Sequence, residues 1–232
     1  MLNIINFQIS TIFQNVDIFT SLLYLVLIFY SVWSWAIIID KFFKFRILNI
    51  RTNKFKKIFW SGSVLEEIYQ KIKNNQTYPS AVIFAAAMQE WEGINVVKII
   101  QDKDNGKREA FKERLNVIME NALTKSLKKI RFGMNFLAII SSSSGVIGFL
   151  ATSWNLINTF NVIAMRQDTS LSIIAPSIAS ALFGIILGLF VLIPALIFGI
   201  HYNKKINDFE DEMAIFCNDI YVILSKELEQ NV

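Results

Sequence analysis

Two long uncharged stretches dominate the pattern of hydrophobic and polar positions in this chain. Residues 132–165 and 169–203 are 34 and 35 residues long, and neither contains Asp, Glu, Lys or Arg. A helix needs about 20 apolar residues to cross the hydrocarbon core of a bilayer, which is roughly 30 Å thick. We therefore expect two transmembrane helices in these stretches, joined by a short charged turn at residues 166–168.

A third uncharged stretch lies near the N-terminus. Residues 18–39 carry no charge, include Trp33 and Trp35 near their end, and are followed by basic residues from Lys41 onward. Interfacial aromatic residues followed by basic residues are typical of the cytoplasmic end of a span. We expect the first transmembrane helix here, with residues 1–17 forming a periplasmic N-terminal segment that lies on the membrane surface as a short amphipathic helix.

The basic residues are concentrated between the first and second spans. Residues 40–131 hold nineteen of the 23 Lys and Arg residues, which by the positive-inside rule places this 92-residue segment in the cytoplasm. The apolar periodicity predicts three amphipathic helices, and Gly62 predicts a turn near the first of them. We expect the last helix to continue into the second span without a break. The three predicted helices are Phe55–Lys73, Ser80–Gln101 and Lys107–Arg131.

The chain is expected to return to the cytoplasm after the third span. In residues 204–232 apolar side chains recur every three or four positions, which predicts a C-terminal helix packed on the other cytoplasmic helices. The fold class is therefore all-α: a polytopic membrane protein with three transmembrane helices and a cytoplasmic helical bundle.

The two long spans are lined with small and polar residues on one face. One interpretation is close helix packing, because small residues let transmembrane backbones approach each other. The other is that part of this face lines a polar path for ions, and the two can hold together in an oligomer. The packing candidates are Gly145, Gly148, Ser177, Ala181, Gly184, Gly188 and Pro194. The candidates for a proton path are Ser144, Thr152, Asn155 and Ser180.

Composition excludes several other classes of function. At 53% hydrophobic residues, the chain is too apolar for an ordinary soluble domain. Its net charge is +4, but its basic residues do not form the aromatic–basic surface typical of a nucleic-acid-binding protein. Cys217 is the only cysteine, so there is no internal disulfide and no cysteine cluster for a metal. No motif for catalysis or for a cofactor is present. The spans also lack carboxylates, so a proton relay would need an ionisable group from a partner.

Short motifs spread over the chain resemble a known family. Most of the chain, from about residue 21 to residue 228, is similar to the TolQ/ExbB/MotA family of proton-driven motor stators, and most similar to its TolQ branch. The motifs that carry the resemblance are Ser34-Trp35-Ala36, Phe59-Trp60-Ser61-Gly62, Ile174-Ala175-Pro176, Ala181-Leu182, Gly188-Leu189 and Pro194-Ala195.

The resemblance implies a pentamer in the bacterial inner membrane around a dimer of a TolR-like single-span partner, whose membrane carboxylate carries the proton. Work would pass to a TolA-like protein and serve envelope integrity and cell division in a Tol-Pal system. An ExbB-like role in outer-membrane uptake is the alternative within the family. In the aligned third span Ser180 and Ile185 stand where the family usually has glutamate and threonine, and Ser177 replaces a common glycine. A structural scaffold that does not conduct is therefore the alternative of another class.

Overall fold

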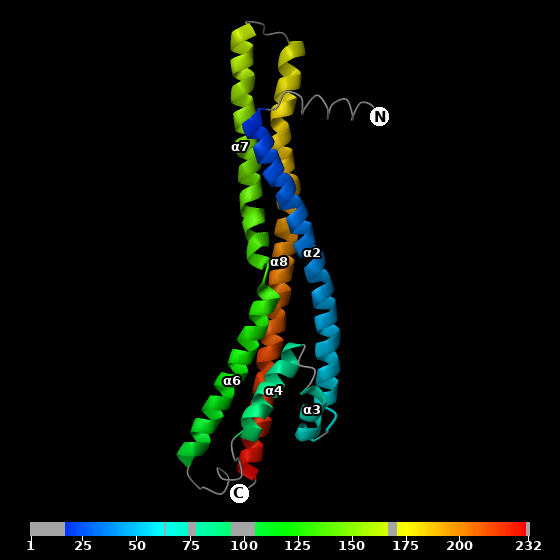
Figure 1. The fold of residues 1–232 in the computed structure, drawn as a ribbon, viewed down its shortest axis with the longest axis vertical. Helices are drawn as coiled ribbons and strands as arrows, with labels where there is room; N and C mark the ends of the chain where they lie inside the picture. Colours follow the sequence, from blue (N-terminus) through cyan, green and yellow to red (C-terminus); the bar gives the residue numbers. More distant parts are fainter. Residues whose placement is uncertain (1–16, 63, 74–77, 94–104, 167–170, 231–232) are drawn as a thin grey trace. The chain divides into compact units, whose positions relative to one another are not determined.

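The computed structural model describes residues 17–62, 64–73, 78–93, 105–166 and 171–230, and the structural statements below concern these residues. Every element in them is helical, as the all-α prediction requires (Figure 1). The predicted surface helix within residues 1–17 and most of the predicted turn at residues 166–168 lie outside the described residues. The helices are α2 (Ile18–Phe59), α3 (Leu65–Ile72), α4 (Pro79–Gly93), α6 (Asn105–Arg131), α7 (Met134–Arg166) and α8 (Leu171–Gln230).

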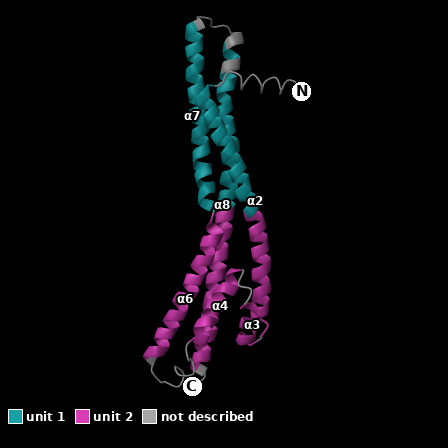
Figure 2. Ribbon diagram, viewed as in Figure 1, with its two compact units in different colours: residues 1–40, 133–201 teal, residues 41–132, 202–232 magenta. Residues whose placement is uncertain are grey.

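The chain divides into two compact units (Figure 2). Unit 1 comprises residues 1–40 and 133–201, and unit 2 comprises residues 41–132 and 202–232. The long helices α2 and α8 each contribute residues to both units. This division separates the uncharged segments of the sequence from most of the charged ones.

Unit 1 is built from three long apolar helical segments. By length and composition, α2, α7 and α8 are each able to cross a membrane, which agrees with the three predicted spans. Most of their large apolar side chains point away from the unit, as expected for helices whose solvent is lipid. Contacts between the helices involve small residues, some buried aliphatic side chains such as Leu137, and aromatic rings such as those of Trp35 and Phe198, whose centroids are 6.4 Å apart.

Unit 2 has a hydrophobic core of its own. Phe55 and Phe59 of α2 meet Phe84 of α4 and Phe216 of α8, with ring centroids 5.1 to 6.4 Å apart. The C-terminal half of α8 buries its apolar stripe in the same core, which confirms the prediction that this segment packs on the other amphipathic helices. Interlocking aromatic rings of this kind stabilise a core beyond the area they bury.

Ion pairs at the surface of unit 2 join different helices. Lys56 of α2 pairs with Glu212 of α8 at 2.6 Å, and Lys112 of α6 pairs with Glu229 of α8 at 2.9 Å. The exposed Glu229 carboxylate accepts a hydrogen bond from the Lys112 ammonium, which raises the pKa of Lys112 and lowers that of Glu229. Partly exposed ion pairs of this type contribute little to stability.

The predicted helix Phe55–Lys73 is wrong. Helix α2 extends unbroken from the first span to Phe59, a turn follows, and α3 begins at Leu65. Gly62 in this turn has a φ of +77°, a left-handed conformation that glycine adopts without steric cost. Helix α4 (Pro79–Gly93) covers the described part of the predicted helix Ser80–Gln101, and the rest of the predicted range lies outside the described residues.

The expectation of one uninterrupted helix into the second span is also wrong. Helix α6 ends at Arg131 and α7 begins at Met134, with Gly133 between them at a φ of +88°. The break leaves the last carbonyl groups of α6 without intrahelical partners. The buried Lys41 ammonium donates to one of them, the Ile130 carbonyl, at 2.5 Å. A cation at the C-terminus of a helix also complements the helix dipole.

Candidate functional site

The candidate site lies on the facing sides of α7 and α8 within unit 1. Three glycines bring the two backbones together: a Cβ on Gly148 would stand 2.7 Å from the Gly184 carbonyl oxygen and 2.8 Å from the Gly188 Cα. A Cβ on Gly188 would stand 2.7 Å from the Ser144 carbonyl oxygen. No side chain fits in such a space, so glycine at these positions permits the close contact. These contacts are made within one chain.

The remaining packing candidates are placed less tightly. Ala181 is fully buried, and a Cβ on Gly145 would meet only the flexible end of Leu192 at 2.6 Å. Pro194 is half-buried within the continuous helix α8. The side chain of Ser177 lies outside the described part of α8.

Thr152 lies at the Gly184 end of the close contact. Its side chain is 9% exposed, and its hydroxyl donates to the Gly148 carbonyl one turn earlier at 3.0 Å. Its Oγ1 atom is 2.9 Å from where a Gly184 Cβ would be. A threonine that bonds its own helix in this way leaves its oxygen lone pairs available to a further donor.

Ser144 differs from the serines that precede it. The hydroxyls of Ser141, Ser142 and Ser143 all donate to carbonyl oxygens of the preceding turn. The Ser144 hydroxyl is completely buried and has no hydrogen-bond partner in the part of the chain that the structure describes. An unsatisfied buried hydroxyl is unfavourable by about 1–3 kcal/mol, so a feature of this kind is uncommon in helix packing.

Asn155 takes part in a hydrogen-bond network that connects α7 to α2. The Thr20 hydroxyl donates to the Asn155 Oδ1 at 3.1 Å, and the Asn155 Nδ2 donates to the Tyr24 hydroxyl at 3.2 Å. Thr20 and Tyr24 are both almost completely buried. This arrangement places Asn155 at the contact of α7 with α2, and the Tyr24 ring in turn meets Phe183 of α8 with ring centroids 6.0 Å apart.

Sequence reasoning missed Thr20 and Tyr24. Both are polar, and their spacing of four residues puts them on one face of the otherwise apolar first span, a signal present in the sequence. On α8, Ser180 and Ile185 are both half-buried. The structure thus places Ser144 and Thr152 at the α7–α8 contact, while Asn155 of α7 hydrogen-bonds to α2 and Ser180 is half-buried on α8.

The single cysteine, Cys217, lies in unit 2. Burial of the Cys217 thiol, with a smaller contribution from the Glu120 carboxylate, raises its pKa to about 11. Because the thiolate is the nucleophile, such a thiol is unreactive near neutral pH. Within the described residues no group of three His, Cys, Asp or Glu side chains could hold a metal ion.

The architecture of unit 1 is that of a multi-pass helical membrane protein. The MotA/TolQ/ExbB proton channel family matches residues 75–215, and the chain belongs to this family. Membership in a family of proton channels confirms the predicted resemblance and the prediction that the chain is not an enzyme.

Similarity to individual proteins extends over nearly the whole chain. The chain is 27% identical to the Tol-Pal system protein TolQ of Pseudomonas aeruginosa over 94% of its length and 93% of that protein. It is 27% identical to the TolQ of Haemophilus influenzae over 93% of both chains. It is 25% identical to the biopolymer transport protein ExbB of Salmonella typhimurium over 94% of this chain and 87% of that protein.

Proposed function

We propose that this chain is a TolQ-like inner-membrane subunit of a motor driven by the proton-motive force. With a TolR-like single-span partner, it energises a TolA-like protein in a Tol-Pal system that maintains the envelope during cell division. The single observation that carries the proposal is the family match together with full-length similarity, which is slightly higher to TolQ than to ExbB.

The absence of acidic residues in the spans supports a proton site shared with a partner. Residues 18–39, 132–165 and 169–203 contain no Asp or Glu. A carboxylate is the usual relay group inside a membrane, so in this proposal the TolR-like partner supplies it. The chain contributes hydroxyl groups beside the path, with Thr152 accepting and the buried Ser144 donating or accepting a hydrogen bond.

In this proposal five copies of the chain surround two copies of the partner. The tight glycine contact keeps α7 and α8 of each copy together as one rigid pair. The exposed apolar faces of that pair then contact lipid and neighbouring copies. A rigid pair allows small movements of the partner to be transmitted without the subunit deforming.

Two other functions are each favoured by a specific observation. An ExbB-like energiser of outer-membrane uptake is favoured by the 25% identity to ExbB over 94% of the chain. A scaffold that does not conduct is favoured by Ser180 and Ile185, because isoleucine cannot hydrogen-bond water or a carboxylate.

Proton flux into liposomes that contain this chain and its TolR-like partner tests the proposal. We expect flux that disappears when the partner's membrane carboxylate is changed to the amide. We also expect Thr152→Val to abolish flux while the complex stays assembled, because valine keeps the volume and removes the hydroxyl.

Thr159→Val is the matched control. Thr159 is also buried on α7, and its hydroxyl donates to the Asn155 carbonyl at 2.9 Å. We expect this variant to conduct. An intact complex without flux would contradict the motor and favour the scaffold, and flux that survives Thr152→Val would exclude Thr152 from the path.

A further inference from the structure

Helix α8 has an exposed face in unit 2, opposite the face that it buries in the core. Exposed side chains recur there every three or four positions, so they form one stripe along the helix. Two of them are apolar, with Ile215 65% and Val222 54% exposed. We call this set the α8 stripe, and its members are Asp208, Asp211, Ile215, Asn218 and Val222.

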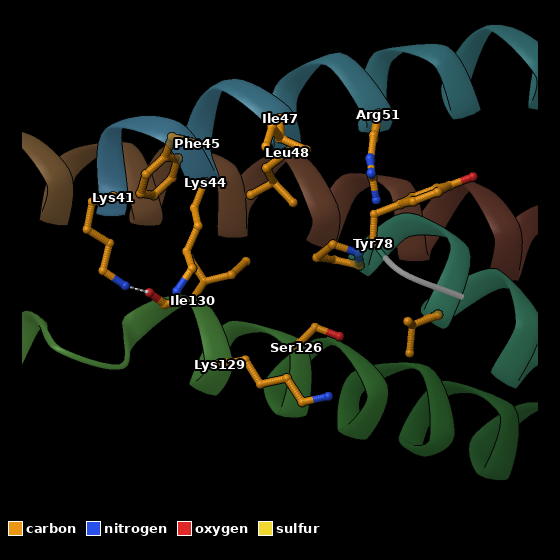
Figure 3. Close-up of a pocket in the computed structure, with 12 residues that line it drawn as sticks. Lys41, Lys44, Phe45, Ile47, Leu48, Arg51, Tyr78, Ser126, Lys129 and Ile130 are labelled. Atoms are coloured by element: carbon orange, nitrogen blue, oxygen red, sulfur yellow. Dashed lines mark hydrogen bonds between the residues drawn. The ribbon is translucent and has the colours of Figure 1, made fainter. Parts of the chain in front are cut away.

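Helix α6 has an exposed stripe with the same spacing. The other face of α6, which carries Ser126 and Ile130, is turned toward α2 and α4, and the Ile130 carbonyl accepts a hydrogen bond from Lys41 (Figure 3). Because α6 and α8 bury their inner faces in one core, the two stripes of a single chain point away from that core. The α6 stripe consists of Val117, Asn121, Thr124 and Lys128.

Two ion pairs fix the register of α6 against α8. Arg131 pairs with Glu210 and Lys112 pairs with Glu229, so the helices are antiparallel and the two pairs lie 19 positions apart on each helix. In this register each member of the α6 stripe lies within two positions, about 3 Å along the axis, of the level of one member of the α8 stripe. The matched residues are Lys128 with Asp211, Thr124 with Ile215, Asn121 with Asn218, and Val117 with Val222.

The matched residues are complementary in chemistry. Lys128 and Asp211 have opposite charges, and neither forms an ion pair with another residue that the structure describes. The side-chain amides of Asn121 and Asn218 are both donors and acceptors, so they can hydrogen-bond to each other. Val117 and Val222 are both apolar and exposed. Each stripe therefore presents what the other lacks, at the same level.

A neighbouring copy in the membrane would preserve these levels. Copies in a closed ring are related by rotation, and a rotation about the membrane normal leaves every residue at its height. Helix α8 is continuous from Leu171 to Gln230, so its C-terminal part shares the tilt of the span, which for transmembrane helices averages about 20°. The α6 stripe of one copy is then level with the α8 stripe of the next copy.

Helix α2 is the other helix of unit 2 with a cation at this level. Lys56 pairs with Glu212, which puts the exposed Lys54 near the level of Asp211. However, α2 ends at Phe59, whose ring meets that of Phe216, so it does not extend to Asn218 and Val222. Helix α6 extends along the whole α8 stripe and is the better match.

We propose that the α8 stripe of one copy docks against the α6 stripe of the next copy, with an ion pair between Lys128 and Asp211 and an apolar contact between Val117 and Val222. The contact joins unlike faces, so it repeats around a ring. The inference rests on the ring of copies in the proposed function, and it is independent of proton conduction.

Disulfide cross-linking between two differently tagged full-length chains tests this surface. Both chains carry Cys217→Ser and are expressed together in membranes, one with Lys128→Cys and the other with Asp211→Cys. On mild oxidation we expect a disulfide-linked dimer that contains both tags. Either variant expressed alone should give at least about tenfold less dimer, because identical positions on neighbouring copies are too far apart for a disulfide.

A second pair and a measurement of copy number decide between the outcomes. In the second pair Lys54→Cys replaces Lys128→Cys, and a mixed dimer from this pair alone would assign the contact to α2 and overturn the proposal. Native mass spectrometry of the same samples reports the number of copies. Several copies without the expected mixed dimer would overturn the α6–α8 surface alone, whereas a single copy would also contradict the ring in the proposed function.

A charge exchange tests the pair of Lys128 and Asp211. Asp211→Lys brings two cations together, so we expect the ratio of oligomer to monomer in detergent to fall at least about threefold. Adding Lys128→Asp restores opposite charges and should return the ratio to within about twofold of the wild type. A double variant that is no better than Asp211→Lys would overturn the pairing.

Glu92→Lys is the matched control for the charge exchange. It makes the same change of charge at an exposed position of α4, outside both stripes. We expect the ratio of oligomer to monomer to stay within about twofold of the wild type, because salt screens distant charges. A loss equal to that of Asp211→Lys would assign the effect to net charge and overturn the specific contact.

Discussion

Gly133 has a backbone conformation that other residues rarely adopt. Its φ of +88° separates α6 from α7, and a Cβ at this position would meet only the Ile37 Cγ2 at an ordinary 3.8 Å. The strain of a substitution would therefore come from the backbone alone. We expect Gly133→Ala to lower the free energy of unfolding by about 1–2 kcal/mol, measured by chemical denaturation in detergent.

Gly93→Ala is the control for this substitution. Gly93 ends α4, has no positive φ, and a Cβ added there would have no atom of the described residues within 4 Å. We expect the unfolding free energy of this variant to stay within about 0.5 kcal/mol of the wild type. If Gly133→Ala is equally harmless, the chain does not need the break between α6 and α7.

At the scale of the helices, the backbones of α7 and α8 approach each other closely in unit 1. Gly188→Ala would drive a methyl group into the Ser144 carbonyl and the Gly148 Cα, and backbone atoms cannot rotate out of the way. We expect a loss of about 1–3 kcal/mol in unfolding free energy and a lower yield of assembled complex, measured by denaturation and size-exclusion chromatography. The larger Gly184→Leu and Gly188→Leu should abolish assembly.

The same helix offers a matched control. A Cβ on Gly199 of α8 would be 3.7 Å from the Leu137 side chain, which is an ordinary contact distance. Gly199→Ala should therefore be neutral or stabilise the protein by up to about 1 kcal/mol, because alanine favours a helix more than glycine does. A loss at Gly199 equal to that at Gly188 would show that the close approach is not the cause.

At the scale of the whole molecule, the distribution of charge predicts the orientation in the membrane. We expect the segment between the first and second spans to be cytoplasmic and the turn between the second and third to be periplasmic. A membrane-impermeant maleimide applied to spheroplasts should label Met165→Cys, whose position is 85% exposed at the end of α7, and should not label Ser61→Cys.

Both substitutions are made in a Cys217→Ser background, which removes the only native thiol. Permeabilised cells provide the control, since both positions should then react. Labelling of Ser61→Cys alone in spheroplasts would contradict the proposed orientation and indicate the opposite one.

The sequence by itself determined the three spans, the all-helical class and the family. These features depend on local properties: the length of an uncharged stretch, the period of its apolar residues, and short motifs. A backbone exposed to lipid has to form its hydrogen bonds within its own helix. A long uncharged stretch therefore predicts a transmembrane helix without any knowledge of contacts distant in the sequence. The C-terminal amphipathic helix was also predictable from local sequence, because its apolar side chains recur at the helical period and have to be buried.

Only the tertiary structure decided which residues meet. Asn155 lies 135 positions from Thr20, and Lys41 lies 89 positions from Ile130, yet each pair is joined by a hydrogen bond. The periodicity of a helix gives the face on which a residue lies but not the partner of that face. The break at Gly133 was missed because sequence that favours a helix continues on both sides of it.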